Sequence, residues 1–135
     1  MLTWFEKHNQ ISLGITIFGA IAIFYISSLS FSGVIGKPNI LSTLYHFFAF
    51  FCFAFFLLIS ALKGREKYLI FFLAVLISII YGISDELHQF FVPGRDCSFF
   101  DILIDTTGIL FASILYFISI EYRKKFIYSK NKSKL

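Results

Sequence analysis

The sequence predicts an all-α, polytopic membrane protein with four transmembrane helices. Of its 135 residues, 58% are hydrophobic and 15% are charged, against about 45–50% and about 25% in typical soluble domains. The hydrophobic residues gather in four runs of about the 20 residues that a helix needs to cross a bilayer. Both prolines and several glycines fall between these runs, where the chain has to turn.

The first two spans are predicted over residues 11–31 and 41–62. Residues 9–36 carry no charged side chain. Residues 38–62 contain His46 and no Asp, Glu, Lys or Arg. Gly33, Gly36 and Pro38 break the chain between the two spans. The runs are too long for strands of a small domain. The first run also exceeds the apolar core of about 7–15 residues that a cleaved signal peptide has, although Ser28 to Ser30 loosely resembles a cleavage site.

The third span is predicted over residues 68–84, and its helix should extend to about residue 91, before the Pro93-Gly94 turn. The fourth is predicted over residues 99–120, with Asp101 and Asp105 in its first two turns. A basic tail follows over residues 121–135. Residues 1–135 then form a single membrane domain.

Basic residues predict the orientation. With four spans, both termini and the loop between the second and third spans share one side of the membrane. Lys37 and Arg95 lie on the other side, against ten basic residues on the first: Lys7, Lys63, Arg65, Lys67, Arg123, Lys124, Lys125, Lys130, Lys132 and Lys134. The positive-inside rule therefore predicts a cytoplasmic-membrane protein with both termini in the cytoplasm. The basic excess indicates orientation rather than a nucleic-acid partner, and the tail is either solvated or lies on anionic lipid.

A polar segment at the outer ends of the third and fourth spans holds five of the eight acidic residues. On a continued third helix, Asp85, His88 and Gln89 share one face, and Glu86 lies on the adjacent face. Asp101 and Asp105 form an i, i+4 pair near a helix N-terminus, where negative charge is favoured. The loop that joins the two helices carries Arg95, which is expected to pair with these carboxylates or to hold an anionic group.

The outer ends of the first two spans add Ser28 and His46 to this segment. Ionisable groups at membrane depth are costly and indicate a functional site. The candidate catalytic residues are His46, Asp85, Glu86 and His88, and the candidate metal ligands are His46, Asp85 and His88. The candidate substrate-binding residues are Ser28, Gln89, Arg95, Asp101 and Asp105. The alternatives are purely structural: Asp101 and Asp105 cap a helix, and His46 is a core histidine whose hydrogen bonds are made within the bundle.

Other motifs are less informative. The His-Glu-x-x-His pattern of zinc proteases, a glycine-rich phosphate loop and a nucleophile elbow are absent from the sequence. Cys52 is expected to be a small buried residue near the bilayer centre. Cys97 lies in the outer loop, too far in depth from Cys52 for a disulfide. The sequence identifies neither a cofactor nor an oligomeric state.

The polar segment resembles the VanZ-like family of small membrane proteins. The resemblance rests on Tyr81-Gly82-x-Ser84-Asp85-Glu86-x-His88-Gln89, Phe91 to Arg95, Ser98, Asp101, Asp105 and Gly108. His46 to Phe50 and Ser27-Ser28 are similar to further family segments, so the resemblance covers residues 20–115. Ser42 and Thr43 stand where the family often has an Asp-Lys pair, and Asp105 stands where it often has Asn.

The founding member of that family is associated with low-level resistance to teicoplanin, a lipidated glycopeptide antibiotic. The resemblance thus implies action at the outer face on a cell-envelope component, a lipid-linked envelope precursor or a glycopeptide. Three hypotheses stay open. In the first, the site binds or remodels such a ligand. In the second, the protein is a membrane-embedded hydrolase or transferase, with or without a metal. In the third, it is a structural partner subunit whose polar cluster only holds the helices together.

Overall fold

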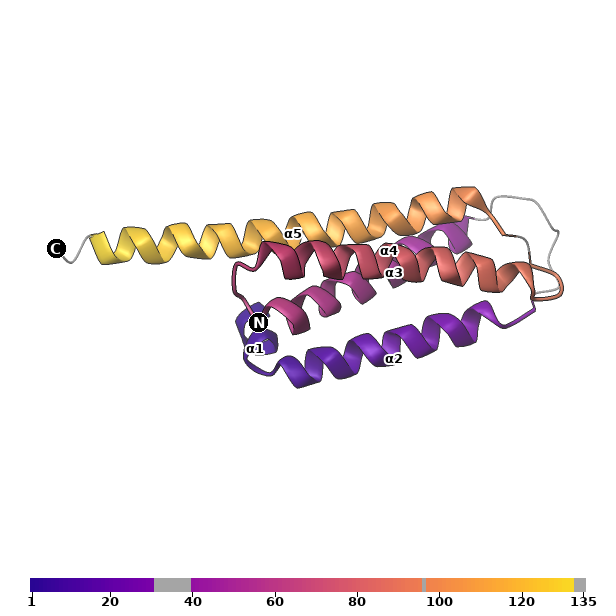
Figure 1. The fold of residues 1–135 in the computed structure, drawn as a ribbon, viewed down its shortest axis with the longest axis horizontal. Helices are drawn as coiled ribbons and strands as arrows, with labels where there is room; N and C mark the ends of the chain where they lie inside the picture. The colour runs from indigo at the N-terminus through magenta and orange to yellow at the C-terminus, as the bar shows by residue number, and fades with distance from the viewer. Residues whose placement is uncertain (31–39, 96, 133–135) are drawn as a thin grey trace.

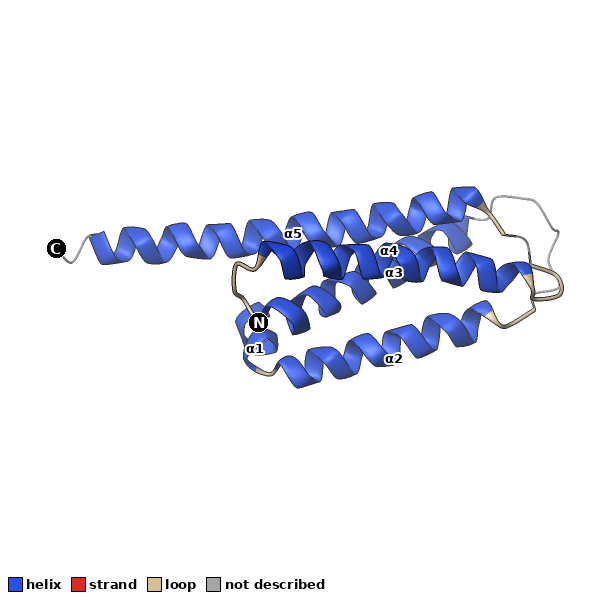
Figure 2. Ribbon diagram, viewed as in Figure 1, coloured by secondary structure: helices blue, strands red, loops and turns tan. Residues whose placement is uncertain are grey.

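The computed structural model describes residues 1–30, 40–95 and 97–132. Within these ranges all regular structure is α-helical (Figure 2). The helices are α1 (Leu2–Lys7), α2 (Asn9–Ser27), α3 (Ile40–Leu62), α4 (Tyr68–Phe90) and α5 (Phe99–Lys132). The last four are long and apolar enough to cross a bilayer. The predicted all-α fold with four transmembrane helices is confirmed.

The predicted span limits agree best for α3 and α4, which match residues 41–62 and the extension to about residue 91 within one residue. The first span was predicted to reach residue 31, but α2 ends at Ser27. Arg95 bonds the backbone carbonyls of Ile26 and Leu29 at this end, and so satisfies oxygens that a helix terminus leaves free. Residues 31–39, with Lys37 and the predicted Gly-Pro turn, lie outside the described residues.

Two helical features were not predicted. The short helix α1 precedes α2, and α5 continues past residue 120 to Lys132, through a segment without the glycine or proline that would end it. Glu6 of α1 joins these features, because its carboxylate accepts hydrogen bonds from Arg123 and from the Tyr116 hydroxyl. The Tyr116 oxygen also accepts the Gly64 backbone N–H at 3.2 Å. These hydrogen bonds join α1, α5 and the turn after α3.

The central helix is α3, which contacts every other helix. Figure 1 shows α5 and α2 on opposite sides of the bundle, with α3 and α4 between them. The core residues Phe50 and Ala54 of α3 pack with Ile109 and Ala112 of α5, all fully buried. Gly108 permits this approach, since a Cβ atom there would lie 2.4 Å from the Phe47 carbonyl oxygen.

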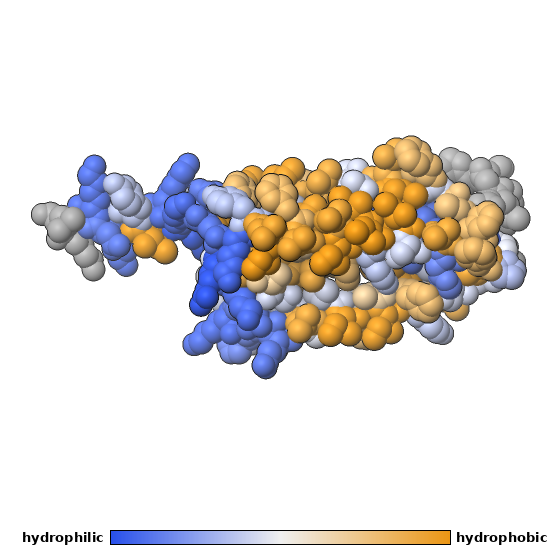
Figure 3. Space-filling view, in the orientation of Figure 1, coloured by the Kyte–Doolittle hydropathy of each residue, from blue (hydrophilic) through white to orange (hydrophobic). Residues whose placement is uncertain are grey.

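The outer surface of the bundle is apolar. Ile17, Leu69 and Phe72 are among many large hydrophobic side chains exposed on the long helices, and Figure 3 shows hydrophobic residues over much of the visible face of the bundle. Such a surface suits lipid rather than water. The prediction that Cys52 is buried was wrong: its side chain is exposed, because an apolar residue in a membrane helix can face lipid without cost. Cys97 is exposed too, and both cysteines are free.

The two ends of the bundle differ. The N-terminus, the α3–α4 turn and the projecting end of α5 lie at one end, called here the basic end (Figure 1). Hydrophilic residues gather there in Figure 3. The opposite end, called here the polar end, is formed by the last turns of α2 and α4 and the first turns of α3 and α5. The structure thus places both termini and the α3–α4 turn at the same end of the bundle, as predicted. That this end faces the cytoplasm stays a prediction.

Candidate functional site

Four ionisable side chains come together inside the polar end. His46 projects from the second turn of α3, Asp85 and Glu86 from the last turns of α4, and Asp105 from the second turn of α5. Their exposed fractions are 1%, 3%, 0% and 1%, respectively. We call these four residues the His-acid cluster. Ionisable groups are rarely buried without hydrogen-bond or ion-pair partners.

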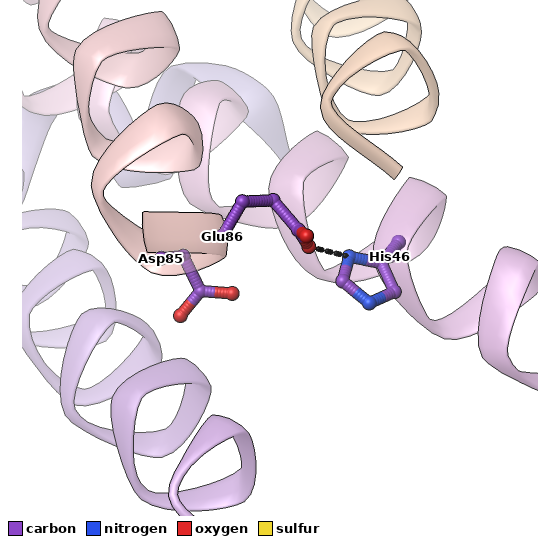
Figure 4. A group of neighbouring side chains, drawn as sticks. All are labelled: His46, Asp85 and Glu86. Carbon is purple, nitrogen blue, oxygen red and sulfur yellow. Dashed lines mark ion pairs between the residues drawn. The ribbon is translucent and has the colours of Figure 1, made fainter. Parts of the chain in front are cut away.

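His46 joins α3 to α5. Its Nδ1 atom lies 3.0 Å from Asp105 Oδ1, and a carboxylate can only accept, so Nδ1 carries the proton of this hydrogen bond. The same nitrogen lies 3.8 Å from Glu86 Oε1, which Figure 4 marks as an ion pair. His46 therefore lies between carboxylates from two other helices.

Asp85 and Glu86 are held in place by neutral donors. Asp85 Oδ2 accepts the Ser27 hydroxyl of α2 at 2.9 Å and the Gln89 amide at 3.0 Å. The same Gln89 amide donates to Glu86 Oε1 at 3.2 Å. Gln89 is 2% exposed, and it lies one turn further along α4, as the predicted spacing requires. It bridges the two carboxylates and donates to both through one amide nitrogen.

The start of α5 is fixed to the same cluster. Glu86 Oε2 accepts the Ser98 backbone N–H at 2.9 Å, while the Ser98 hydroxyl accepts the Asp101 backbone N–H at 3.3 Å. Ser98 is thus the N-cap residue of α5. In a capping box the N-cap N–H is bonded by a side chain of the same helix, and here a carboxylate of α4 takes that place. Asp101 is half-buried in the first turn, outside the cluster.

His88 lies apart from the cluster. Its ring stacks on Phe24 of α2 with a centroid separation of 4.5 Å, and its Nε2 atom lies 2.9 Å from the Ser28 Oγ atom. The Ser28 hydroxyl donates to the Phe24 carbonyl, so His88 Nε2–H donates to Ser28. His88 and Ser28 were both candidate site residues, and the structure pairs them with each other at the α2–α4 contact.

Arg95 contacts the end of α2. Its guanidinium donates to the carbonyl oxygens of Ile26 and Leu29, at 3.0 Å and 3.2 Å. Asp105, one of the carboxylates it was expected to pair with, is bonded by His46 instead. Arg95 therefore anchors the end of α2 beside the site.

An apolar groove between α2 and α3 leads to the polar end. It has a volume of about 200 Å³ and is lined by six residues of α2, from Ile15 to Ile26, and five of α3, from Tyr45 to Phe56. Its last residues are the chain neighbours of the site: Ile26 precedes Ser27, and Tyr45 precedes His46. The Tyr45 hydroxyl is buried and has no hydrogen-bond partner among the described residues.

Comparison with protein families gives one match, the VanZ/LLP1 family, over residues 2–120 of the chain. The match covers the polar segment, α2, α3, α4 and the part of α5 up to Ile120. The chain belongs to this family. A comparison with curated proteins found no match, and neither did a comparison with solved structures. The predicted resemblance to VanZ-like proteins is thereby confirmed.

Sequence reasoning placed the candidate residues at one end, and the structure divides them into three groups. The cluster takes His46, Asp85, Glu86 and Asp105, with Gln89 between two of them, while Ser28 pairs with His88 and Arg95 anchors α2. Asp101 lies in the first turn of α5, outside these groups. Three contributors were not among the candidate site residues: Ser27, Ser98 and Tyr45, of which Ser27 and Ser98 carry part of the family resemblance. Ser98 carries a sequence signal, a serine directly before a helical run, whereas nothing in the pattern separates Ser27 from its neighbour Ser28.

Proposed function

We propose that this VanZ-like protein binds or remodels a lipophilic cell-envelope component at the outer face of the cytoplasmic membrane. The ligand would be an amphiphile with an acyl or isoprenoid chain, such as a lipid-linked envelope precursor or an acylated glycopeptide of the teicoplanin type. The observation that carries the proposal is the apolar α2–α3 groove. Its lining includes Tyr45, which directly precedes His46, and Ile26, which directly precedes the Asp85 partner Ser27.

The groove and the cluster suit the two halves of such a ligand. At about 200 Å³, the groove is smaller than the about 300–1,000 Å³ of pockets that enclose a whole small molecule. It would hold one segment of a chain whose remainder lies in the bilayer. The polar head would then reach the Tyr45 hydroxyl and the carboxylates beyond it. Few polar groups beside an apolar wall are typical of ligand sites.

The outer face is supported by charge. Eight of the ten basic residues that predict a cytoplasmic side follow α3 or lie in the last turns of α5, at the basic end. The positive-inside rule then directs the polar end outward. Lipid-linked wall precursors and glycopeptides both act on that side.

Blocking the groove tests the proposal. Ala22 lines the groove and Ile21, its neighbour on α2, is 62% exposed. In nanodiscs containing the full chain, we expect teicoplanin or a lipid-linked wall precursor to bind wild type. Ala22→Trp should weaken that binding at least about tenfold, or about 1.4 kcal/mol, and Ile21→Trp should not. Equal binding by both variants, each with wild-type helicity, would contradict the proposal, as would binding of neither probe to wild type.

A glycopeptide without an acyl chain serves as the ligand control, because it lacks the group that the groove would hold. A second candidate function, a membrane-embedded hydrolase or transferase, is favoured by the convergence of His46, Asp85 and Glu86 at one point. Incubation of the same nanodiscs with a lipid-linked precursor separates the two: a released head group or a transferred group, lost in Glu86→Gln, would establish catalysis.

A further inference from the structure

We propose that the His-acid cluster is a binding site for a divalent transition-metal ion, held by a ring nitrogen of His46 and the carboxylates of Asp85 and Glu86. Asp105 is assigned the role of holding the His46 ring in position. This inference goes beyond the proposed function and does not depend on which lipophilic ligand occupies the groove.

The geometry brings three ligand types to one point. One potential ligand atom from each of His46, Asp85 and Glu86 lies within 4.8 Å of the other two, and all three residues are buried. Figure 4 shows the Asp85 and Glu86 carboxylates reaching from α4 toward the His46 ring. Ligand atoms of one metal with bonds of about 2.0–2.2 Å lie about 3–4 Å apart, so the side chains need to move inward only slightly.

The charges in the cluster call for a cation. Three carboxylates are buried together with one imidazole, so with all three ionised the cluster carries a net charge of −2 even when His46 is protonated. The donors that the structure places on Asp85 and Glu86 are neutral: a hydroxyl, an amide and a backbone N–H. Buried carboxylates are neutralised by protonation, by pairing or by a bound metal ion, and a divalent ion would neutralise two of these three groups at once.

Unpartnered oxygen atoms give a second, independent indication. Asp85 Oδ1 and Asp105 Oδ2 are buried and have no hydrogen-bond partner among the described residues, although their residues are 3% and 1% exposed. A buried carboxylate oxygen without a donor is costly. A metal ion bound to Asp85 would remove that cost at one of the two atoms.

The ligand set indicates the kind of metal. Imidazole together with carboxylates suits zinc, manganese or iron(II), whereas magnesium and calcium favour oxygen alone. Three protein ligands leave at least one position open, as in sites where the metal also binds water or substrate. Because Nδ1 donates to Asp105, Nε2 is the nitrogen left for the metal, as in the carboxylate–histidine contacts that orient metal-bound histidines.

Metal titration of the purified full chain tests this site. After chelator treatment, we expect about one equivalent of Zn²⁺ or Mn²⁺ to bind and to raise the thermal unfolding temperature. Asp85→Asn, Glu86→Gln and His46→Gln should abolish both effects. Asp105→Asn should weaken binding about 10–100-fold, as loss of an orienting carboxylate does at other metal sites.

Two matched variants at the same end complete the test. His88→Ala and Asp101→Asn remove a histidine and a carboxylate outside the cluster, and both should bind the metal as wild type does. Binding that survives Asp85→Asn and Glu86→Gln, or that is lost with His88→Ala, would overturn the proposed ligand set. Absence of binding to wild type would overturn the metal site itself. A variant that binds no metal counts only if its helicity and elution volume match wild type.

Discussion

The hydrogen bond between His46 and Asp105 joins α3 to α5 through side chains that are almost fully buried. Removal of either residue leaves a polar group without its partner inside the bundle, which is the costly case for a buried pair. Hydrogen bonds between membrane helices are worth about 0.6 kcal/mol on average and up to about 1.7 kcal/mol. Because the acceptor is a carboxylate, we expect the free energy of the His46–Asp105 bond to lie toward the upper end of this range.

A double-mutant cycle of His46→Phe and Asp105→Leu should therefore give a coupling free energy of about 1–2 kcal/mol, measured by reversible unfolding in detergent. Ser113 provides the comparison, since it is buried on the same helix but bonds its own backbone at Ile109. His46→Phe and Ser113→Ala should be additive within about 0.5 kcal/mol. A coupling near zero for the first pair would contradict the described contact.

The close packing of α3 and α5 at Gly108 gives a second prediction for a single residue. A methyl group at this position would meet the Phe47 backbone, whereas one at Gly14 would meet nothing within 4 Å. Gly108→Ala should destabilise the protein by about 1–3 kcal/mol because α3 and α5 must separate. Gly14→Ala should be neutral or stabilising by up to about 1 kcal/mol, since alanine favours a helix. Unfolding measured in the same detergent compares the two, and equal effects would contradict the close α3–α5 packing.

At the scale of whole elements, the polar end depends on how α2 is terminated. Arg95 reaches from the α4–α5 connection to two carbonyl oxygens at that terminus, and Ser27 reaches from α2 to Asp85. These contacts hold α2 in position beside the groove. They make Arg95 an anchoring residue with a structural effect that can be measured.

Arg95→Ala should increase amide hydrogen exchange in the last turn of α2, residues 24–28, by at least about tenfold. Hydrogen bonds from charged donors contribute about 1.5–3 kcal/mol, and their loss allows a helix end to open locally. Arg65→Ala removes an exposed arginine at the basic end and should leave exchange in that turn unchanged. Unaltered exchange in Arg95→Ala would show that other contacts hold α2.

The sequence predicted the elements better than their ends. Apolar run length determines α3 and α4, because a bilayer requires that length, and both helices match the prediction closely. The end of α2 was placed too late, since the contact that stops it comes from Arg95, far away in the chain. The partner of Glu6 could not be foreseen for the same reason: Arg123 lies 117 residues away, and no local pattern links the two.

The candidate site shows the same limit. Helical spacing brought Asp85 and Gln89 to one face correctly, because that spacing is local. Periodicity cannot decide which way a side chain turns when two helices are within reach. For this reason the His88 side chain contacts Ser28 at the end of α2 and not the cluster. Glu86, rather than His88, is the third side chain that lies close to His46 and Asp85.

For the whole molecule, orientation in the membrane is the feature on which function most depends. The two cysteines allow it to be measured. With Cys52→Ser to leave one thiol, Cys97 at the polar end should react with a membrane-impermeant maleimide in intact cells. In a Cys52→Ser, Cys97→Ser background, Ser129→Cys at the basic end should react only after permeabilisation. The reverse pattern would place the polar end in the cytoplasm and contradict the positive-inside argument.

The central claim is that the groove and the His-acid cluster hold one amphiphilic ligand together. The most direct test places the photoreactive residue p-benzoylphenylalanine at Phe18, which lines the groove, and at Phe72, which is 66% exposed on α4. After irradiation in living cells, mass spectrometry of the crosslinked protein identifies what lies against each position. We predict a specific acylated envelope molecule at Phe18 that is absent at Phe72 and is lost with Glu86→Gln. The same bulk phospholipids at both positions, unaffected by Glu86→Gln, would contradict the claim.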